Sequence, residues 1–137
     1  MLYMLDTDIC SYMMRRKMPG LVERFQKARE AGHTIGISVI AYGEMRLGAE
    51  RSGAPGRYHH QLNALSDRLD YIADWASHHA DRFAVLHANL LSEGRTIGIN
   101  DTMIAAHALC LGATLITNDE RHFGRIEALQ FENWTKG

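Results

Sequence analysis

Short apolar runs alternate with longer segments in which apolar residues recur every three or four positions. The apolar runs are typical of buried strands, and the longer segments are typical of amphipathic helices. The expected strands cover residues 2–5, 35–39, 71–72, 114–117 and 129–134. Strands separated by helices imply parallel pairing, because a parallel partner needs a long crossover connection. The pattern therefore predicts an α/β fold, a three-layer α/β/α sandwich with a central parallel sheet.

Polar residues mark the points where the intervening helices should begin. The expected helices cover residues 8–16, 21–32 and 58–69, with others beginning near residues 38, 74 and 100. The residues expected to cap or open helices are Thr7 or Asp8, Ser38, Asp74, and Asn100 or Asp101. Side chains of these types accept hydrogen bonds from the first free backbone N–H groups of a helix. Gly32, Gly94 and Gly112 follow helical segments, as glycines at helix ends commonly do.

Length and composition indicate one domain without covalent or metal cross-links. The chain has 137 residues, 46% of them hydrophobic, so we expect residues 1–137 to form a single domain. Cys10 and Cys110 lie far apart and form no CxxC pair, which is typical of reduced thiols. No apolar run approaches the ~20 residues that cross a bilayer, and acids interrupt the N-terminal apolar stretch. The sequence predicts a cytoplasmic protein with no membrane partner.

Acidic residues stand at the ends of two predicted strands. Ligands of open parallel sheets bind beyond the carboxyl ends of the strands. Asp6 follows the first strand directly, and Asp119 lies two residues beyond Thr117 at the end of another. Asp101 begins a helix, where the helix dipole stabilises a carboxylate. For any one of these residues alone, a turn or capping role is the favoured interpretation.

Glu44 is a fourth acid of interest. It lies within an apolar helical face with Ile40 and Leu47, which we expect to pack near the sheet. Glutamate is rarely buried without a partner. A solvated side chain is the alternative interpretation.

Convergence of these four acids would carry an electrostatic cost that a cation can offset. Each pair of carboxylates ~4 Å apart costs roughly 4 kcal/mol at an effective dielectric constant of 20. A fold tolerates this only if a cation binds among them or some stay protonated. Oxygen ligands favour Mg²⁺ or Mn²⁺ over zinc, and such an ion can activate water and neutralise a phosphate. The hydroxyls of Thr7 and Thr117 stand beside these acids and can support them.

Four segments carry a resemblance to a known family. They are LDTD at residues 5–8, YGEMRLGAE at 42–50, IGINDTMIAAHA at 97–108 and LITNDERHF at 115–123. Together they resemble the motifs of PIN-domain ribonucleases, and their layout is similar to that of VapC toxins from bacterial toxin–antitoxin pairs. The similarity runs nearly end to end and includes the aromatic residue Trp134.

The resemblance implies a Mg²⁺- or Mn²⁺-dependent endoribonuclease. Its implied metal ligands are Asp6, Glu44, Asp101 and Asp119, with Thr7 and Thr117 in support. It also implies homodimerisation and a cognate antitoxin whose tail enters the acidic site, and contact with operator DNA only through that antitoxin. A tRNA is the implied substrate, with initiator tRNA as first candidate. The chain departs from the family at Asp8, where Asn or Ser is common, and so adds a charge at the edge of the site.

Overall charge neither supports nor excludes an RNA partner. The formal net charge is −1, but the four candidate acids account for four negative charges, which leaves the rest at about +3. Arg15, Arg16 and Lys17 form a basic run that can meet an RNA backbone or simply be a solvated helix end. The pairs at residues 59–60 and 78–79 are interpreted as packing or surface histidines.

Three other functions compete with the nuclease. The segment Asp6-Thr7-Asp8 also resembles the start of a haloacid-dehalogenase-type phosphatase, with Asp6 as nucleophile and Asp8 as general acid. Cys10 departs from that motif, and no convincing lysine partner follows. This chain also lacks the lysine that a receiver-type phosphoacceptor domain carries after a late strand. A PIN module that binds RNA or an antitoxin without cutting is disfavoured by the four intact acids.

Overall fold

Five parallel strands form the centre of the molecule. The computed structural model describes residues 1–16 and 18–136. The strands are β1 (Leu2–Leu5), β2 (Thr34–Ser38), β3 (Tyr71–Ala73), β4 (Thr114–Ile116) and β5 (Phe131–Glu132). They form one sheet in the order β3-β2-β1-β4-β5, and each neighbouring pair is parallel. The predicted α/β architecture with a parallel sheet is confirmed.

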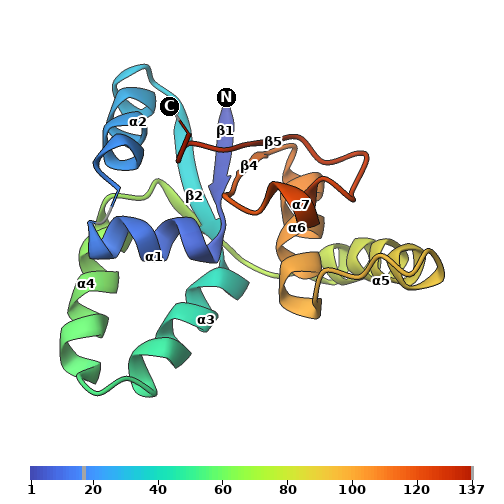
Figure 1. The fold of residues 1–137 in the computed structure, drawn as a ribbon, viewed down its shortest axis with the longest axis horizontal. Helices are drawn as coiled ribbons and strands as arrows, with labels where there is room; N and C mark the ends of the chain where they lie inside the picture. The colour runs from blue at the N-terminus through green and yellow to red at the C-terminus, as the bar shows by residue number, and fades with distance from the viewer. Residues whose placement is uncertain (17, 137) are drawn as a thin grey trace.

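Helices cover both faces of this sheet. They are α1 (Thr7–Arg15), α2 (Pro19–Glu30), α3 (Val39–Glu50), α4 (Pro55–Asp67), α5 (Ser77–Ser92), α6 (Ile99–Leu111) and α7 (Glu120–Phe123). The chain moves outward from β1 to β3 and then returns across the sheet to β4. Because such crossovers are right-handed, α1 to α4 lie on one face and α5 and α6 on the other, as Figure 1 shows.

The strands are buried over most of their length. Met4, Leu5, Ile35 and Ile37 have no exposed surface, which accounts for their near-continuous apolar sequences. Trp134 at the end of the chain is also buried and packs edge-on against the Tyr3 ring, 5.0 Å between centroids.

Gly36 in β2 leaves room for the ring of Tyr71, which comes from the neighbouring strand β3. A Cβ atom at this position would lie 2.3 Å from the ring of Tyr71, so a larger residue would force the ring away. The Tyr71 hydroxyl donates a hydrogen bond to the carbonyl oxygen of Tyr3, 2.6 Å away. This contact links strands β3 and β1 across β2.

Several helix starts differ from the predicted positions. Ser38 caps α3 as expected, since its Oγ accepts from the backbone N–H of Ile40 at 3.0 Å. The cap of α1 is Asp6 rather than Thr7 or Asp8. Helix α5 begins at Ser77 after Ala76, so Asp74 is not its cap. Helix α6 begins at Ile99 after Gly98, whose φ is 98°, ahead of the two expected openers at 100 and 101.

Two helices begin earlier than predicted, each at a proline. Pro19 and Pro55 are the first residues of α2 and α4, where a missing N–H costs nothing. The short helix α7 was not predicted, and the last strand is shorter than expected.

The buried face of α3 is not the one predicted. Ala41, Met45 and Ala49 are buried, whereas Leu47 is 57% exposed and Ile40 only partly covered. Small alanines let the helix approach its neighbours closely, so burial does not follow side-chain size here. Glu44 lies beside this face and is half-buried.

Helices of the described chain are too short or too polar to cross a membrane. Cys10 is buried and Cys110 half-buried, and both are free thiols.

Candidate acidic active site

Asp6 lies where the chain leaves two adjacent strands in opposite directions. In sheets of this kind, such a switch point opens a crevice at the carboxyl ends of the strands. The backbone N–H of Asp6 donates to the carbonyl oxygen of Ile116 at the end of β4, 3.0 Å away. Its carboxylate accepts from the N–H of Ile9 at 2.9 Å and from the side chain of Thr117. Both strand ends therefore fix this buried carboxylate.

Glu44 faces the first residues of α1 and α6. Thr7 Oγ1 donates to Glu44 Oε1 at 2.8 Å, and Asn100 Nδ2 donates to Glu44 Oε2 at 3.3 Å. Asp101 follows Asn100 in the first turn of α6 and is half-buried. The hydroxyl of Thr7 thus supports Glu44, and Thr117 supports Asp6.

Asp119 is held by the short helix α7. Its Oδ1 accepts from the backbone N–H of His122 at 3.2 Å, and its Oδ2 lies 2.7 Å from His122 Nδ1. The N–H of Asp119 donates to Thr117 Oγ1 at 2.9 Å, which ties it to the strand end. His122 was missed in the sequence, although aspartate followed by histidine three residues later is the available signal.

The electrostatics of the site resist ionisation. Burial raises the pKa of Asp6 to about 7, and the charges of Asp8 and Asp101 add to this, while its hydrogen bonds oppose it. Burial also raises the pKa of Asp101 to about 6, with further increases from Glu44, Asp8 and Asp119. Two carboxyl groups near neutral pKa, with other acids around them, are typical of functional sites.

The four acids share one electrostatic neighbourhood without forming a closed ligand set. Within residues 1–16 and 18–136, no group of three or more Asp, Glu, His or Cys side chains is close enough to hold a metal ion. Glu44 is turned toward Thr7 and Asn100, and Asp119 toward His122. Mutual repulsion explains this arrangement, because each acid reduces its charge energy by bonding a separate donor.

Comparison with known proteins identifies the chain. The family model of the PIN domain matches residues 3–129. A protein named ribonuclease VapC2 from Haemophilus influenzae is 39% identical over 132 residues, 96% of this chain and 97% of that protein. A protein named tRNA(fMet)-specific endonuclease VapC from Shigella flexneri is 32% identical over 133 residues, 97% and 98% of the two chains.

Solved structures agree over the whole chain. VapBC2 from Rickettsia felis, bound to a promoter DNA fragment, superposes with a TM-score of 0.92 at 33% identity, covering 98% of this chain and 99% of that one. DNA-bound VapBC from Salmonella typhimurium gives 0.89 at 33% identity with the same coverage. The chain therefore belongs to the PIN-domain family and, within it, to the VapC ribonuclease toxins. This family is generally metal-dependent, and the membership excludes the phosphatase and receiver alternatives.

Proposed function

We propose that residues 1–137 form one PIN domain that cleaves RNA internally with the aid of Mg²⁺ or Mn²⁺. The proposed ligands are Asp6, Glu44, Asp101 and Asp119. The observation that carries this proposal is the buried Asp6 carboxylate at the switch point of the sheet, with Asp101 near enough for their charges to interact. Burial raises the pKa of Asp6 to about 7 and that of Asp101 to about 6. A divalent cation would favour the ionised form of both carboxyl groups, against the burial and the neighbouring charges that raise their pKa values.

The donor chemistry fits such an ion. The candidate ligands are carboxylate oxygens, which Mg²⁺ and Mn²⁺ prefer. Glu44 and Asp119 now bond a hydroxyl, an amide and an imidazole, groups that a side-chain rotation can release. When bound, the ion would activate water and neutralise charge on the scissile phosphate.

The remaining residues hold and orient these acids. The Thr117 side chain bonds the Asp6 carboxylate, and Thr7 Oγ1 bonds Glu44 Oε1 at 2.8 Å. Asp6 must lose its proton before it can act as a ligand. Because burial raises the pKa of Asp6 to about 7 without metal and a bound cation lowers it, cleavage should increase with pH and level off by about pH 7.

Similarity to named relatives suggests the partners. A relative is named as a tRNA(fMet)-specific endonuclease, so we propose a tRNA substrate with initiator tRNA first, cleaved in the cytoplasm. Solved relatives are VapBC complexes, some bound to DNA, so we propose a cognate antitoxin that carries the operator contact. An arginine or lysine of that antitoxin would be attracted into the acidic crevice. We propose homodimerisation on the same family grounds.

Metal dependence is tested with labelled tRNA and purified protein. Cleavage should require Mg²⁺ or Mn²⁺, stop in EDTA and return when the ion is restored in excess. Undiminished cleavage in the chelator would refute the proposed metal role. RNA binding with no cleavage under any of these metals would favour the non-cleaving module instead.

The biological role is tested by expression in bacteria. The chain expressed alone should halt growth, and co-expression with a small protein encoded just upstream should restore it. Normal growth at high levels of folded protein would contradict a toxin role.

A further inference from the structure

A cavity of about 570 Å³ lies between the last turn of α1 and helix α4. Four arginines line it: Arg15, Arg16, Arg57 and Arg68. Within the described residues, none of these guanidinium groups forms an ion pair with a carboxylate. Lys17, the third residue of the basic run, lies outside the described residues. The cavity therefore concentrates positive charge that the surrounding described chain does not neutralise.

The side chains present few internal contacts. Arg15 donates to Ser11 Oγ at 2.6 Å, and Arg68 donates to Gln26 Oε1 at 3.5 Å while lying over the Phe25 ring. All these partners are neutral. A neutral partner satisfies an N–H group but leaves the charge available to an anion.

Arg16 occupies a backbone conformation that favours glycine. It follows α1 with φ at 53°, and it is the only non-glycine residue with positive φ among residues 1–16 and 18–136. Glycine is the common residue at such a helix end because it has no Cβ. An arginine there costs local stability that a glycine would not.

Gln61 adds a polar group without a partner. This residue also lines the cavity, and its buried Oε1 has no hydrogen-bond partner among the described residues. An unpaired buried carbonyl costs free energy that a donor would recover. A ligand that combines negative charge with hydroxyl groups would satisfy both the arginines and this amide, and a ribose–phosphate backbone has that composition.

We infer that this arginine-lined cavity binds the sugar–phosphate backbone of the RNA, away from the bond that is cut. The inference rests on the proposed nuclease function, in which the acidic site itself repels the polyanion. Arginine pairs with phosphate oxygens bidentately. Tyr58, 37% exposed, also lines the cavity and offers an aromatic face on which a base can stack.

Helix α1 connects the two sites. Asp6 caps its first turn, whereas Arg15 and Arg16 lie at its last residue and the one after it. Nine residues at 1.5 Å each place these ends roughly 13 Å apart. A stacked strand with a rise of about 3.4 Å per nucleotide crosses that distance in about four nucleotides. One RNA strand can therefore occupy both ends of the helix at once.

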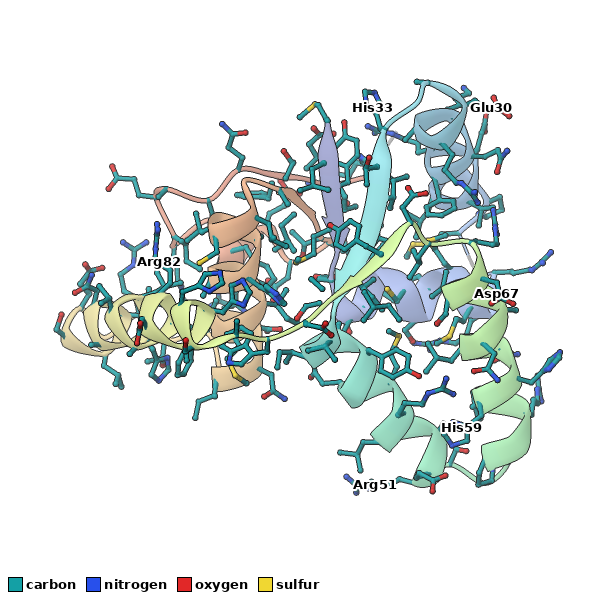
Figure 2. The ribbon with its side chains drawn as sticks, turned by 180° about the vertical axis from the view of Figure 1, so that it is seen from behind. Glu30, His33, Arg51, His59, Asp67 and Arg82 are labelled. Carbon is teal, nitrogen blue, oxygen red and sulfur yellow. The ribbon has the colours of Figure 1, made fainter. Side chains whose placement is uncertain are left out.

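The test uses the variant Arg16→Gly combined with Arg57→Gln. Glycine suits the left-handed conformation at position 16, and Arg57 is exposed, so the fold should be retained. The matched control is Arg82→Gln, an exposed arginine of α5 on the opposite side of the molecule in Figure 2. Binding of a short fluorescein-labelled single-stranded RNA of mixed sequence is measured by anisotropy in EDTA, over a range of KCl concentrations.

Loss of two phosphate contacts has a defined expected size. The slope of log affinity against log salt should become shallower by about 1.4, because each contact contributes roughly 0.7 for single strands. The control should keep the wild-type slope and affinity. With Mg²⁺ present, the double variant should lose kcat/KM at low RNA concentration and recover the wild-type kcat at saturation.

Two results would overturn the inference. The first is an unchanged slope and affinity in the double variant. The second is unchanged RNA binding together with lost binding of an oligoglutamate peptide, which would assign the cavity to an acidic protein partner. Because binding is measured without metal, cleavage that persists in EDTA would refute the proposed metal site and leave this result standing.

Discussion

The molecule contains two clusters of like titratable groups, one of histidines and one of acids, and burial shifts their pKa values in opposite directions. Between α5 and α6, the ring centroids of His78 and His79 lie 4.0 Å apart, and those of His79 and His107 lie 4.3 Å apart. Burial lowers the pKa of both His79 and His107, and the neighbouring histidines lower it further. At the strand ends, burial and neighbouring acids raise the carboxyl pKa values instead.

The histidines are satisfied in their neutral form. His107 Nε2 donates to the carbonyl oxygen of Asp74 at 3.1 Å, so its Nδ1 carries no proton and accepts from Ser38 Oγ at 2.8 Å. Nδ1 of His79 accepts from the N–H of Ala76 at 2.8 Å. These bonds make His79 and His107 part of the buried interior, as the interpretation of a packing histidine anticipated for His79, whereas His78 is exposed.

The surroundings of the acids do not favour a single protonation state. The backbone N–H of Ile9 and the hydroxyl of Thr117 favour the charged form of Asp6, whereas burial favours the neutral form. Neither protonation state of this buried carboxyl group is strongly favoured, because its hydrogen-bond donors and its burial act in opposite directions. The histidine cluster stabilises the fold because its neutral groups have hydrogen-bond partners. The acidic cluster has no such favoured state, which is typical of a site that binds a cation.

The largest expected effect comes from Asp101→Asn. The amide keeps the size of the side chain but removes a charge that the neighbouring acids oppose. Cleavage of labelled tRNA in Mg²⁺ should fall by about 10²–10³-fold. Metal-free stability, followed by thermal melting, should stay equal or rise because carboxylate repulsion is relieved. A variant that unfolds at much lower temperature would mark Asp101 as a structural residue.

The substitution His107→Phe should lower stability strongly and change cleavage little. The phenyl ring fills similar space but leaves the carbonyl of Asp74 and the hydroxyl of Ser38 without their partner. We expect a loss of about 2–4 kcal/mol in the free energy of unfolding, measured in urea. Cleavage well below the melting temperature should stay within a few-fold of wild type. The control is His60→Phe at an exposed position, which should change neither value.

Metal-free stability should depend on pH with opposite slopes for the two clusters. The folded pKa of Asp6, about 7, exceeds its unfolded value, so its contribution is full below about pH 4 and is lost as the pH rises through 7. The lowered pKa of His107 gives a contribution present above about pH 6.5 and lost at lower pH. Urea unfolding in EDTA measures both.

Single substitutions separate these slopes. Asp6→Asn keeps a side-chain oxygen to cap α1 and should remove the Asp6 part of the loss on the alkaline side, worth roughly 2–3 kcal/mol between about pH 5 and 8, and leave the part that the raised pKa of Asp101 contributes. His107→Phe should reduce the loss on the acidic side. Identical pH profiles for wild type and Asp6→Asn would show that Asp6 does not titrate in this range.

The strands and the position of the acids could be predicted because both follow from local pattern. Apolar runs fix β1 and β4, and the rule for parallel sheets then directs attention to Asp6 and Asp119 at their ends. Helix starts were less certain. Gly98 and Ala76 precede α6 and α5 without a capping side chain, so no local polar signal marks the first residue.

Contacts between distant segments could not be predicted. The stack of His79 on His107 depends on the packing of α5 against α6, and the bonds from Thr7 and Asn100 to Glu44 join three helices. The buried face of α3 was predicted wrongly because alanines fill it. That the four acids together hold a metal stays a prediction, because their side chains now bond separate donors.

The smallest effect is expected for Asp8→Asn, which tests how far the acidic cluster extends. Asp8 is exposed in the first turn of α1, and its charge contributes to the raised pKa of both Asp6 and Asp101. Asn removes this charge, so the pKa values of Asp6 and Asp101 should fall slightly. The increase of cleavage with pH should therefore occur at lower pH. The rate at its plateau should stay within about tenfold of wild type, because Asp8 is not among the proposed ligands.

The pH profile of tRNA cleavage in Mg²⁺ measures this change, with Asp67→Asn as control. Asp67 is an exposed acid at the end of α4, labelled in Figure 2 far from the strand ends, and its removal should leave the profile in place. A loss comparable to that of Asp101→Asn would show that Asp8 takes part directly in the chemistry. The acidic site would then have five members, and the residue that departs from the family pattern would be one of its working groups.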